Sequence, residues 1–161
     1  MPTPRRLALV IVTLVVLDQV TKSWAESALD DGRIINVVWT LRFALGYNSG
    51  FAFSQGQGLG PFIGVAAVVV AVVIARSMLK AGSPLSAYGL ALILSGAVGN
   101  VFDRVFRGEG WLHGKVVDFI DFQWFPVFNV ADSCITVGAL LMLLGLFIEQ
   151  RASGRTEEDA P

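Results

Sequence analysis

Four long, charge-poor apolar stretches constrain the fold of this chain more than any other feature of its sequence. They cover about residues 7–24, 59–79, 87–102 and 130–148. The hydrocarbon core of a bilayer is about 30 Å thick, and roughly 20 apolar helical residues cross it. A span surrounded by lipid must satisfy its own backbone hydrogen bonds, which favours the helix even where Val and Ile are frequent. We therefore predict a membrane-embedded, all-α bundle of four transmembrane helices, forming a single domain over residues 1–161.

The composition supports this class and excludes several others. Of the 161 residues, 54% are apolar and only 16% are charged, which excludes a disordered chain and an ordinary soluble domain. Lys and Arg together number 12 and Asp and Glu 13, so the charge balance indicates no nucleic-acid partner. The single cysteine, Cys134, and the single histidine, His113, exclude an internal disulfide and a clustered zinc site. We expect no metal and no cofactor.

The two links on the side opposite the termini, about residues 25–58 and 103–129, have features of their own. Residues 37–44 alternate between apolar and other side chains with a period of two, which predicts a strand in a small sheet at the membrane surface. Residues 47–50 (YNSG) have the composition of a turn. The four tryptophans, Trp24, Trp39, Trp111 and Trp124, lie in or beside these links and indicate an interfacial aromatic belt. The polar tail, residues 151–161, is predicted to be frayed.

Charge counts leave the orientation open. Six Lys or Arg residues fall on the side of the termini and six on the other side. The cations on the terminal side lie close to the span ends, which favours a cytoplasmic location for both termini. Arg5 and Arg6 followed by an apolar core could also form a secretory signal, but Asp18 and Lys22 would be unusual just before a cleavage site.

Polar and ionisable residues gather at one end of the predicted spans. The set comprises Asp18, Lys22, Gly96, Asn100, Asp103, Arg104, Asp118, Asp121, Asn129 and Asp132. Asp18 and Lys22 are four residues apart and can pair on one helix face. Gly96, Asn100 and Asp103 form one stripe of the third span. Ionisable residues at membrane depth are energetically costly, so they mark a candidate functional site.

Each member of this set also has a purely structural interpretation. Asp18 and Lys22 can form an internal ion pair, and Asp103 with Arg104 can end a helix and hold a loop. Asn129 and Asp132 have the spacing of a helix N-cap and its third residue. Asp121 can be a solvated neighbour of Asp118. Asp118 itself is harder to explain structurally, because it lies in an apolar run, VVDFIDF.

Elimination narrows the chemistry. His113 lies in a polar loop away from Cys134 and Ser133, which disfavours a nucleophilic triad, and no phosphate-binding loop is present. Two aspartates that share one proton can hydrolyse a peptide bond without a metal, because one activates water while the other polarises the carbonyl. A small channel or transporter with carboxylates in its pathway, or an assembly subunit, remains an alternative.

Five motifs in this order resemble those of the lipoprotein signal peptidases, also called signal peptidase II. They are LDQVTK (residues 17–22), NSGFAFS (48–54), SGAVGNVFDR (95–104), VVDFIDF (116–122) and FPVFNVADS (125–133). The resemblance implies an intramembrane aspartic endopeptidase of the bacterial inner membrane, with four helices and both termini cytoplasmic. Its active site would face the periplasm beneath a small extracytoplasmic β-sheet, a cradle, with a periplasmic link over the site.

The resemblance also implies the substrate and the roles of individual residues. The substrate would be a prolipoprotein carrying diacylglycerol on a cysteine, cut immediately before that cysteine by a monomer that also contacts membrane lipids. Asp118 and Asp132 match the catalytic pair. Eight residues match positions that shape the pocket or hold substrate: Asn48, Gly50, Gly96, Asn100, Asp103, Arg104, Asn129 and Ala131. Asp18 and Lys22 match a supporting motif, and we expect Phe51, Phe53 and Trp39 to roof the bound peptide.

Overall fold

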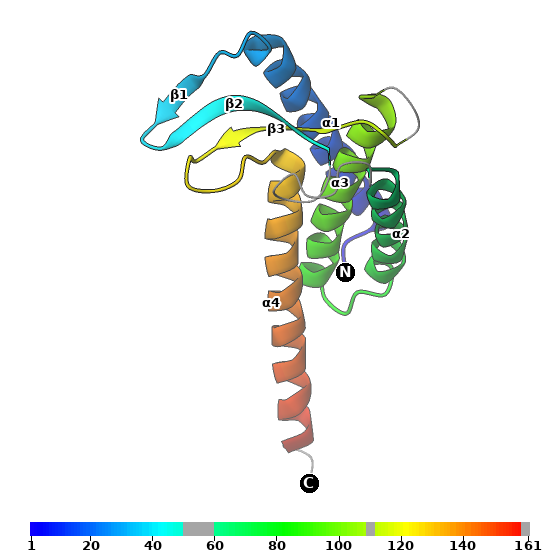
Figure 1. The fold of residues 1–161 in the computed structure, drawn as a ribbon. Helices are drawn as coiled ribbons and strands as arrows, with labels where there is room; N and C mark the ends of the chain where they lie inside the picture. The colour runs from blue at the N-terminus through cyan, green and yellow to red at the C-terminus, as the bar shows by residue number, and fades with distance from the viewer. Residues whose placement is uncertain (50–59, 109–111, 159–161) are drawn as a thin grey trace.

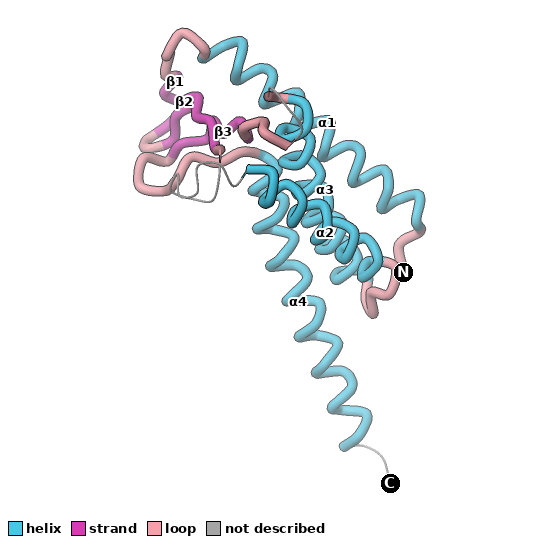
Figure 2. Tube along the Cα trace, turned by 45° about the vertical axis from the view of Figure 1, so that its right-hand side comes forward, coloured by secondary structure: helices cyan, strands magenta, loops and turns pink. Residues whose placement is uncertain are grey.

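The computed structural model describes residues 1–49, 60–108 and 112–158, which form four helices and a three-stranded sheet (Figure 1). The elements follow in the order α1 (Pro4–Leu29), β1 (Ile35–Val38), β2 (Leu41–Asn48), α2 (Gly60–Met78), α3 (Pro84–Phe106), β3 (Val116–Asp121) and α4 (Val130–Glu158). The helices run side by side and the sheet caps one end of them (Figures 1 and 2). The predicted class, a membrane helical bundle with a small sheet, is confirmed.

Within the part of the chain that the structure describes, three helices are long and apolar enough to cross a membrane: α1, α3 and the first part of α4, Val130–Arg151. Within α2 the corresponding apolar segment, Gly64–Met78, is shorter. The whole of α2 has 19 residues, which at 1.5 Å per residue is about 28 Å. This helix therefore just matches the thickness of the hydrocarbon core.

The helices extend beyond the apolar stretches because their ends are set by capping groups. Thr3 caps α1 by accepting a hydrogen bond from the N–H of Arg6, and Ser83 caps α3 in the same way with Ser86. Helix α4 continues to Glu158 and so includes most of the tail that was predicted to be frayed. Figure 2 shows this helix projecting past the other three.

Helix α3 is the centre of the bundle and packs against α1, α2 and α4. Small residues bring α3 and α4 close together. A Cβ added to Gly138 would lie 2.6 Å from the carbonyl oxygen of Gly89, and one added to Gly89 would lie 2.6 Å from the Met142 backbone nitrogen. Membrane helices commonly associate through such small side chains, because lipid provides no hydrophobic force between them.

The sheet is antiparallel with the order β1-β2-β3. The single strand predicted over 37–44 is a hairpin: the chain turns at Trp39 and Thr40 and returns as β2. Trp39 has a φ of 52° and is 97% exposed at the turn. The sequence pattern does not reveal this turn, because Trp39 stands where the alternation of a strand also places an apolar residue. The turn predicted at 47–50 was also wrong at Tyr47 and Asn48, which belong to β2.

Strand β3 comes from the second link and completes the sheet. Asp121 on β3 pairs with Arg42 on β2 at 2.7 Å and is only 5% exposed, so the interpretation of Asp121 as a solvated neighbour was wrong. On the helical side, the Trp24 ring contacts Phe43 and Phe119 at centroid distances of 5.3 and 6.1 Å. These contacts fix the sheet on the end of α1.

Candidate active site

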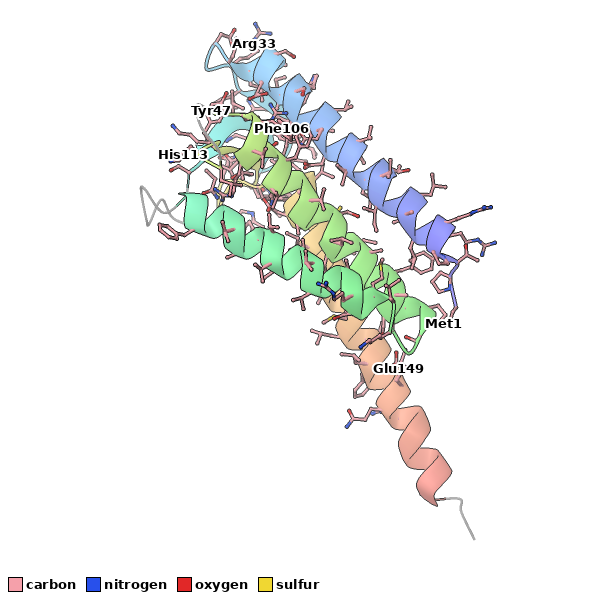
Figure 3. All side chains as sticks on the ribbon, turned by 90° about the vertical axis from the view of Figure 1, so that its right-hand side faces the viewer. Met1, Arg33, Tyr47, Phe106, His113 and Glu149 are labelled. Carbon is pink, nitrogen blue, oxygen red and sulfur yellow. The ribbon has the colours of Figure 1, made fainter. Side chains whose placement is uncertain are left out.

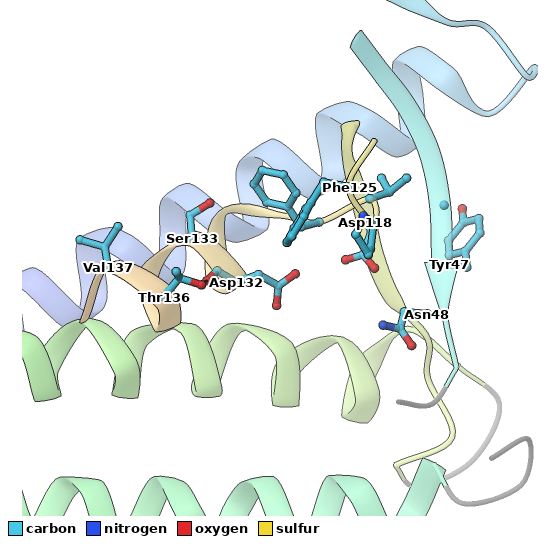
Figure 4. Close-up of a pocket in the computed structure, with 12 residues that line it drawn as sticks. Tyr47, Asn48, Asp118, Phe125, Asp132, Ser133, Thr136 and Val137 are labelled. Carbon is cyan, nitrogen blue, oxygen red and sulfur yellow. The ribbon is translucent and has the colours of Figure 1, made fainter. Parts of the chain in front are cut away.

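Asp118 and Asp132 line the same groove at the junction of the sheet and the helices. Asp118 is on β3 and Asp132 is in the first turn of α4, and their carboxyl groups face the same space in Figure 4. The groove has a volume of about 820 Å³. We refer to these two residues as the aspartate pair.

Two asparagines connect the aspartate pair. Asn129 donates through Nδ2 to Asp118 Oδ1 at 2.7 Å, and Asn100 donates through Nδ2 to Asp132 Oδ1 at 2.9 Å. The two amides also touch each other, with Asn129 Nδ2 lying 3.3 Å from Asn100 Oδ1. Residues from α3, β3 and the start of α4 are thereby joined in one hydrogen-bonded chain.

Asn129 also caps α4, as its spacing from Asp132 predicted. Its Oδ1 accepts from the backbone N–H of Asp132 at 2.9 Å, and Asp132 Oδ2 accepts from the backbone N–H of Asn129 at 3.2 Å. This reciprocal arrangement is a capping box. The structural interpretation and the functional one therefore coincide, since the cap holds Asp132 at the groove.

A buried ion network lies directly behind the pair. It comprises Asp18, Lys22, Asp103 and Arg107. Lys22 Nζ is 2.9 Å from Asp18 and 2.8 Å from Asp103, and the lysine side chain is fully buried. The predicted Asp18–Lys22 pair is present, but Asp103 is a second partner that the spacing of the residues did not reveal. Lys22 also donates to Asn100 Oδ1 at 3.0 Å, which joins the network to the site.

The carboxylates of the network also accept hydrogen bonds from backbone N–H groups. Asp18 accepts from the N–H of Ala131 at 2.9 Å, and Asp103 accepts from the N–H of Val117 at 3.2 Å. These two bonds tie the start of α4 and the strand β3 to the helices, on the residues next to Asp132 and Asp118. The network thus positions both members of the aspartate pair by fixing the backbone of the residues next to them.

The other predicted site residues fall around this centre. Asn48 lines the groove from β2, and Gly96 packs where a Cβ would collide with the Ala131 carbonyl oxygen. Arg104 is buried and lies in the electrostatic field of Asp103 and Asp118. Gly50, like the expected roof residues Phe51 and Phe53, lies outside the described residues. Trp39 is at the hairpin tip and does not line the groove.

Several residues were missed, both in the site and in the ion network behind it. Gln19 donates to both Asp18 and Asp103, and Arg107 pairs with Asp103 at 2.9 Å and with Glu26. Position 19 lies next to Asp18 on the same helix, but no local pattern indicates its distant partner. Gly46 faces Asp118 across the sheet, where the missing side chain keeps the groove open. The apolar wall of the groove comes from Phe125, Pro126, Val127, Phe128 and Val137.

The titration of Asp118 is strongly perturbed. Its pKa is raised to about 7, chiefly by burial and then by the nearby Asp132, while the Asn129 hydrogen bond acts in the opposite direction. Such a carboxyl group carries a proton near neutral pH, which an acid catalyst needs. Among the described residues, no cluster of three or more His, Cys, Asp or Glu side chains could hold a metal ion.

We expect Asp118→Asn to stabilise the protein against unfolding at alkaline pH. The unfolded chain loses this proton near pH 4 and the folded protein near pH 7. The free energy of unfolding therefore falls as the pH rises through this window, by on the order of 2 to 4 kcal/mol. The variant escapes this loss, so its Tm in detergent should exceed that of the wild type at pH 8 but not at pH 4. An equal difference at both pH values would contradict the perturbed titration.

The fold is that of known bacterial membrane enzymes. Two solved structures, each described as a bacterial membrane enzyme, superpose with TM-scores of 0.81 and 0.77. The first is 28% identical and the alignment covers 91% of this chain and 90% of the other. The second is 29% identical, with coverages of 89% and 93%. Fold, apolar helices and similarity together define this chain as a bacterial membrane protein of that class.

Sequence comparison identifies the family. Residues 10–148 match the family described as Signal peptidase (SPase) II. The lipoprotein signal peptidase of Rhodococcus jostii is 42% identical over 145 residues, covering 87% of this chain and 72% of that protein. The lipoprotein signal peptidase of Mycobacterium avium is 41% identical over 145 residues, with coverages of 88% and 80%. The chain belongs to the signal peptidase II family, and is therefore a membrane peptidase.

Proposed function

We propose that this chain is an intramembrane aspartic endopeptidase that removes the signal peptide from diacylglyceryl-modified prolipoproteins, cutting immediately before the lipidated cysteine. The observation that supports this most is the convergence of Asp118 and Asp132 on one groove, each held by an asparagine. Among the residues that the structure describes, no ion pair joins either carboxyl group, and Lys22 and Arg107 pair with Asp18 and Asp103 instead.

The pair can perform hydrolysis by acid–base chemistry alone. The ionised member takes a proton from a water molecule, whose oxygen attacks the scissile carbonyl carbon. The protonated member gives its proton to the carbonyl oxygen, so a gem-diol forms. The C–N bond then breaks as the first aspartate gives the proton it took from water to the leaving amine, which becomes the new N-terminus. A gem-diol hydroxyl returns its proton to the other aspartate, a carboxyl group is left on the released signal peptide, and the pair returns to its starting state. The raised pKa of Asp118 supports such a shared proton.

The shape of the groove supports a lipid-modified substrate. Its wall is aromatic and aliphatic at Phe125, Phe128 and Val137, and it continues along α4 past Ser133 and Thr136 (Figure 4). Beyond it, Leu140 and Leu144 are exposed on the membrane part of α4. Acyl chains that remain in the bilayer would gain about 0.8 kcal/mol per buried methylene and hold the peptide at the pair.

We further propose that the termini are cytoplasmic, the groove faces the extracytoplasmic side, and a monomer is active. Figure 3 places Met1 and Glu149 at the end of the bundle away from Tyr47 and His113. Arg76 and Lys80 lie where α2 ends, at the end of the bundle opposite the sheet, which fits the preference of cations for the cytoplasm. Both aspartates come from one chain, so a single copy contains the whole pair.

The proposal predicts lipid-dependent cleavage. Purified protein in detergent micelles should cut a diacylglyceryl-modified prolipoprotein and release the signal peptide. The unmodified substrate should be cut at least about tenfold more slowly, because it lacks the acyl contacts. Gel shift gives the rates, and mass spectrometry of the mature product gives the bond that was cut. Equal rates on both substrates, or a new N-terminus other than the lipidated cysteine, would contradict this specificity.

A further inference from the structure

The side-chain amide of Asn100 is oriented by a buried lysine. Lys22 Nζ can only donate hydrogen bonds, and it lies 3.0 Å from Asn100 Oδ1. The amide oxygen must therefore face α1, which turns the amide nitrogen toward Asp132 at 2.9 Å. Because Lys22 is held by Asp18 and Asp103 and is fully buried, it has no freedom to release the oxygen.

The Asn129 amide is oriented by the same logic. The backbone N–H of Asp132 can only donate, so the Asn129 oxygen faces it at 2.9 Å. The Asn129 nitrogen is then left to donate to Asp118 at 2.7 Å and to the Asn100 oxygen at 3.3 Å. Every hydrogen bond on the path from Lys22 to the aspartate pair therefore has a fixed direction. It is set by the Lys22 ammonium group and the Asp132 backbone N–H, which can donate but cannot accept.

These directions make the two aspartates unequal. Asp132 receives a donor on each oxygen, from Asn100 Nδ2 and from the backbone N–H of Asn129. Asp118 receives one donor from the described residues, the Asn129 amide. Hydrogen bonds donated to a carboxylate favour its ionised form. Asp132 is also in the first turn of α4, where the helix dipole favours negative charge.

We propose that Lys22 is a positioning residue that, through the Asn100 amide, makes Asp132 the ionised base and leaves the shared proton on Asp118, the acid. This assignment rests on the proposed aspartic mechanism and deepens it. Lys22 does not touch the reacting atoms. Its role is to keep the amide of Asn100 turned so that its donor reaches Asp132. The raised pKa of Asp118 is consistent with the assignment.

Other charged groups lie around the pair on the neighbouring helices. They are Asp18 and Lys22 on α1, and Asp103 and Arg104 on α3. Lys22 is the one cation of the buried ion network that both neutralises these acids and contacts an amide of the site. Arg107 belongs to the same network and pairs with the same Asp103, yet makes no hydrogen bond to Asn100 or Asn129 among the described residues. It therefore offers a matched control.

The test is the pH dependence of kcat/KM on a diacylglyceryl-modified prolipoprotein. The acidic limb of this profile reports ionisation of the pair as a unit. For Lys22→Met we expect this limb to move to higher pH by about one unit, with kcat falling more than KM changes. Asn100→Leu keeps Lys22 with Asp18 and Asp103, so the network remains, and should move the limb in the same direction. The double variant should shift no further than Asn100→Leu alone.

The control separates positioning from stability. Arg107→Gln should lower Tm but leave the pH profile where it is in the wild type. The inference is overturned if Asn100→Leu keeps the wild-type profile, or if Arg107→Gln shifts it as much as Lys22→Met does. Failure of the proposed function looks different, because the wild type would then not cleave at all, or would cleave with either aspartate replaced. Should Lys22→Met not fold, the Asn100→Leu profile decides the matter.

Discussion

Asp118→Asn and Asp132→Asn are each expected to abolish cleavage of a diacylglyceryl-modified prolipoprotein, with a loss of at least about 10³-fold in kcat. Asparagine has nearly the same shape as aspartate and can still accept the hydrogen bond from Asn129 or Asn100. It cannot take a proton from water or supply one to a carbonyl oxygen. The loss should therefore fall on kcat, with a small change in KM, in an assay that follows release of the signal peptide.

Asp121→Asn is the matched control for this experiment. Asp121 lies three residues after Asp118 on the same strand, is equally buried, and pairs with Arg42 rather than with the site. We expect this variant to retain activity within a few-fold of the wild type. If Asp118→Asn or Asp132→Asn cleaved at the wild-type rate while remaining folded, the aspartic mechanism would be wrong, and the carboxylates would have to serve another purpose such as an ion pathway.

The second large effect is expected from Asp103→Asn, which should destabilise the protein by about 3 to 5 kcal/mol. Asp103 accepts from Lys22 at 2.8 Å, from Arg107 at 2.9 Å and from the Val117 N–H at 3.2 Å, and it is fully buried. Removing its charge leaves two cations in the interior with one carboxylate fewer. The Tm in detergent should fall by about 10 °C for a chain of this size.

An exposed ion pair provides the comparison for Asp103. Asp31 and Arg33 also form an ion pair at 2.9 Å, but both side chains are more than half exposed. Asp31→Asn should leave Tm unchanged, because water and salt screen such pairs. The interpretation of the network as a structural anchor would be refuted by an equal fall in Tm for both variants, or by no fall for Asp103→Asn.

Much of the site was predictable because its short-range spacings belong to single helices. Asp18 and Lys22 are four residues apart on α1 and do pair. Asn129 and Asp132 have the spacing of a capping box and do form one. Gly96, Asn100 and Asp103 lie on one face of α3, as predicted. Their partners on the neighbouring helices are Ala131, Asp132 and Lys22. Helical periodicity alone carries these relations.

The errors and omissions arise at positions where local sequence patterns carry no signal. The hairpin turn at Trp39 fits the same alternation as the strands beside it, so the sequence offered no boundary there. Asp121 looked solvated because its partner, Arg42, is 79 residues away on another strand. Gln19 and Arg107 carry no local signal, since their importance lies in the side chains they meet across the bundle.

The sequence by itself determined the membrane spans, the gathering of acids at one end of them and the family motifs, because hydropathy and helical spacing are local properties of the chain. Only the tertiary structure decided how those acids are used. Asp18, Asp103 and Asp121 became structural because cations lie against them, while Asp118 and Asp132 face the groove. The link from Lys22 to Asn100 joins residues 78 positions apart. Such a contact depends on how α1 packs against α3, which no local pattern encodes.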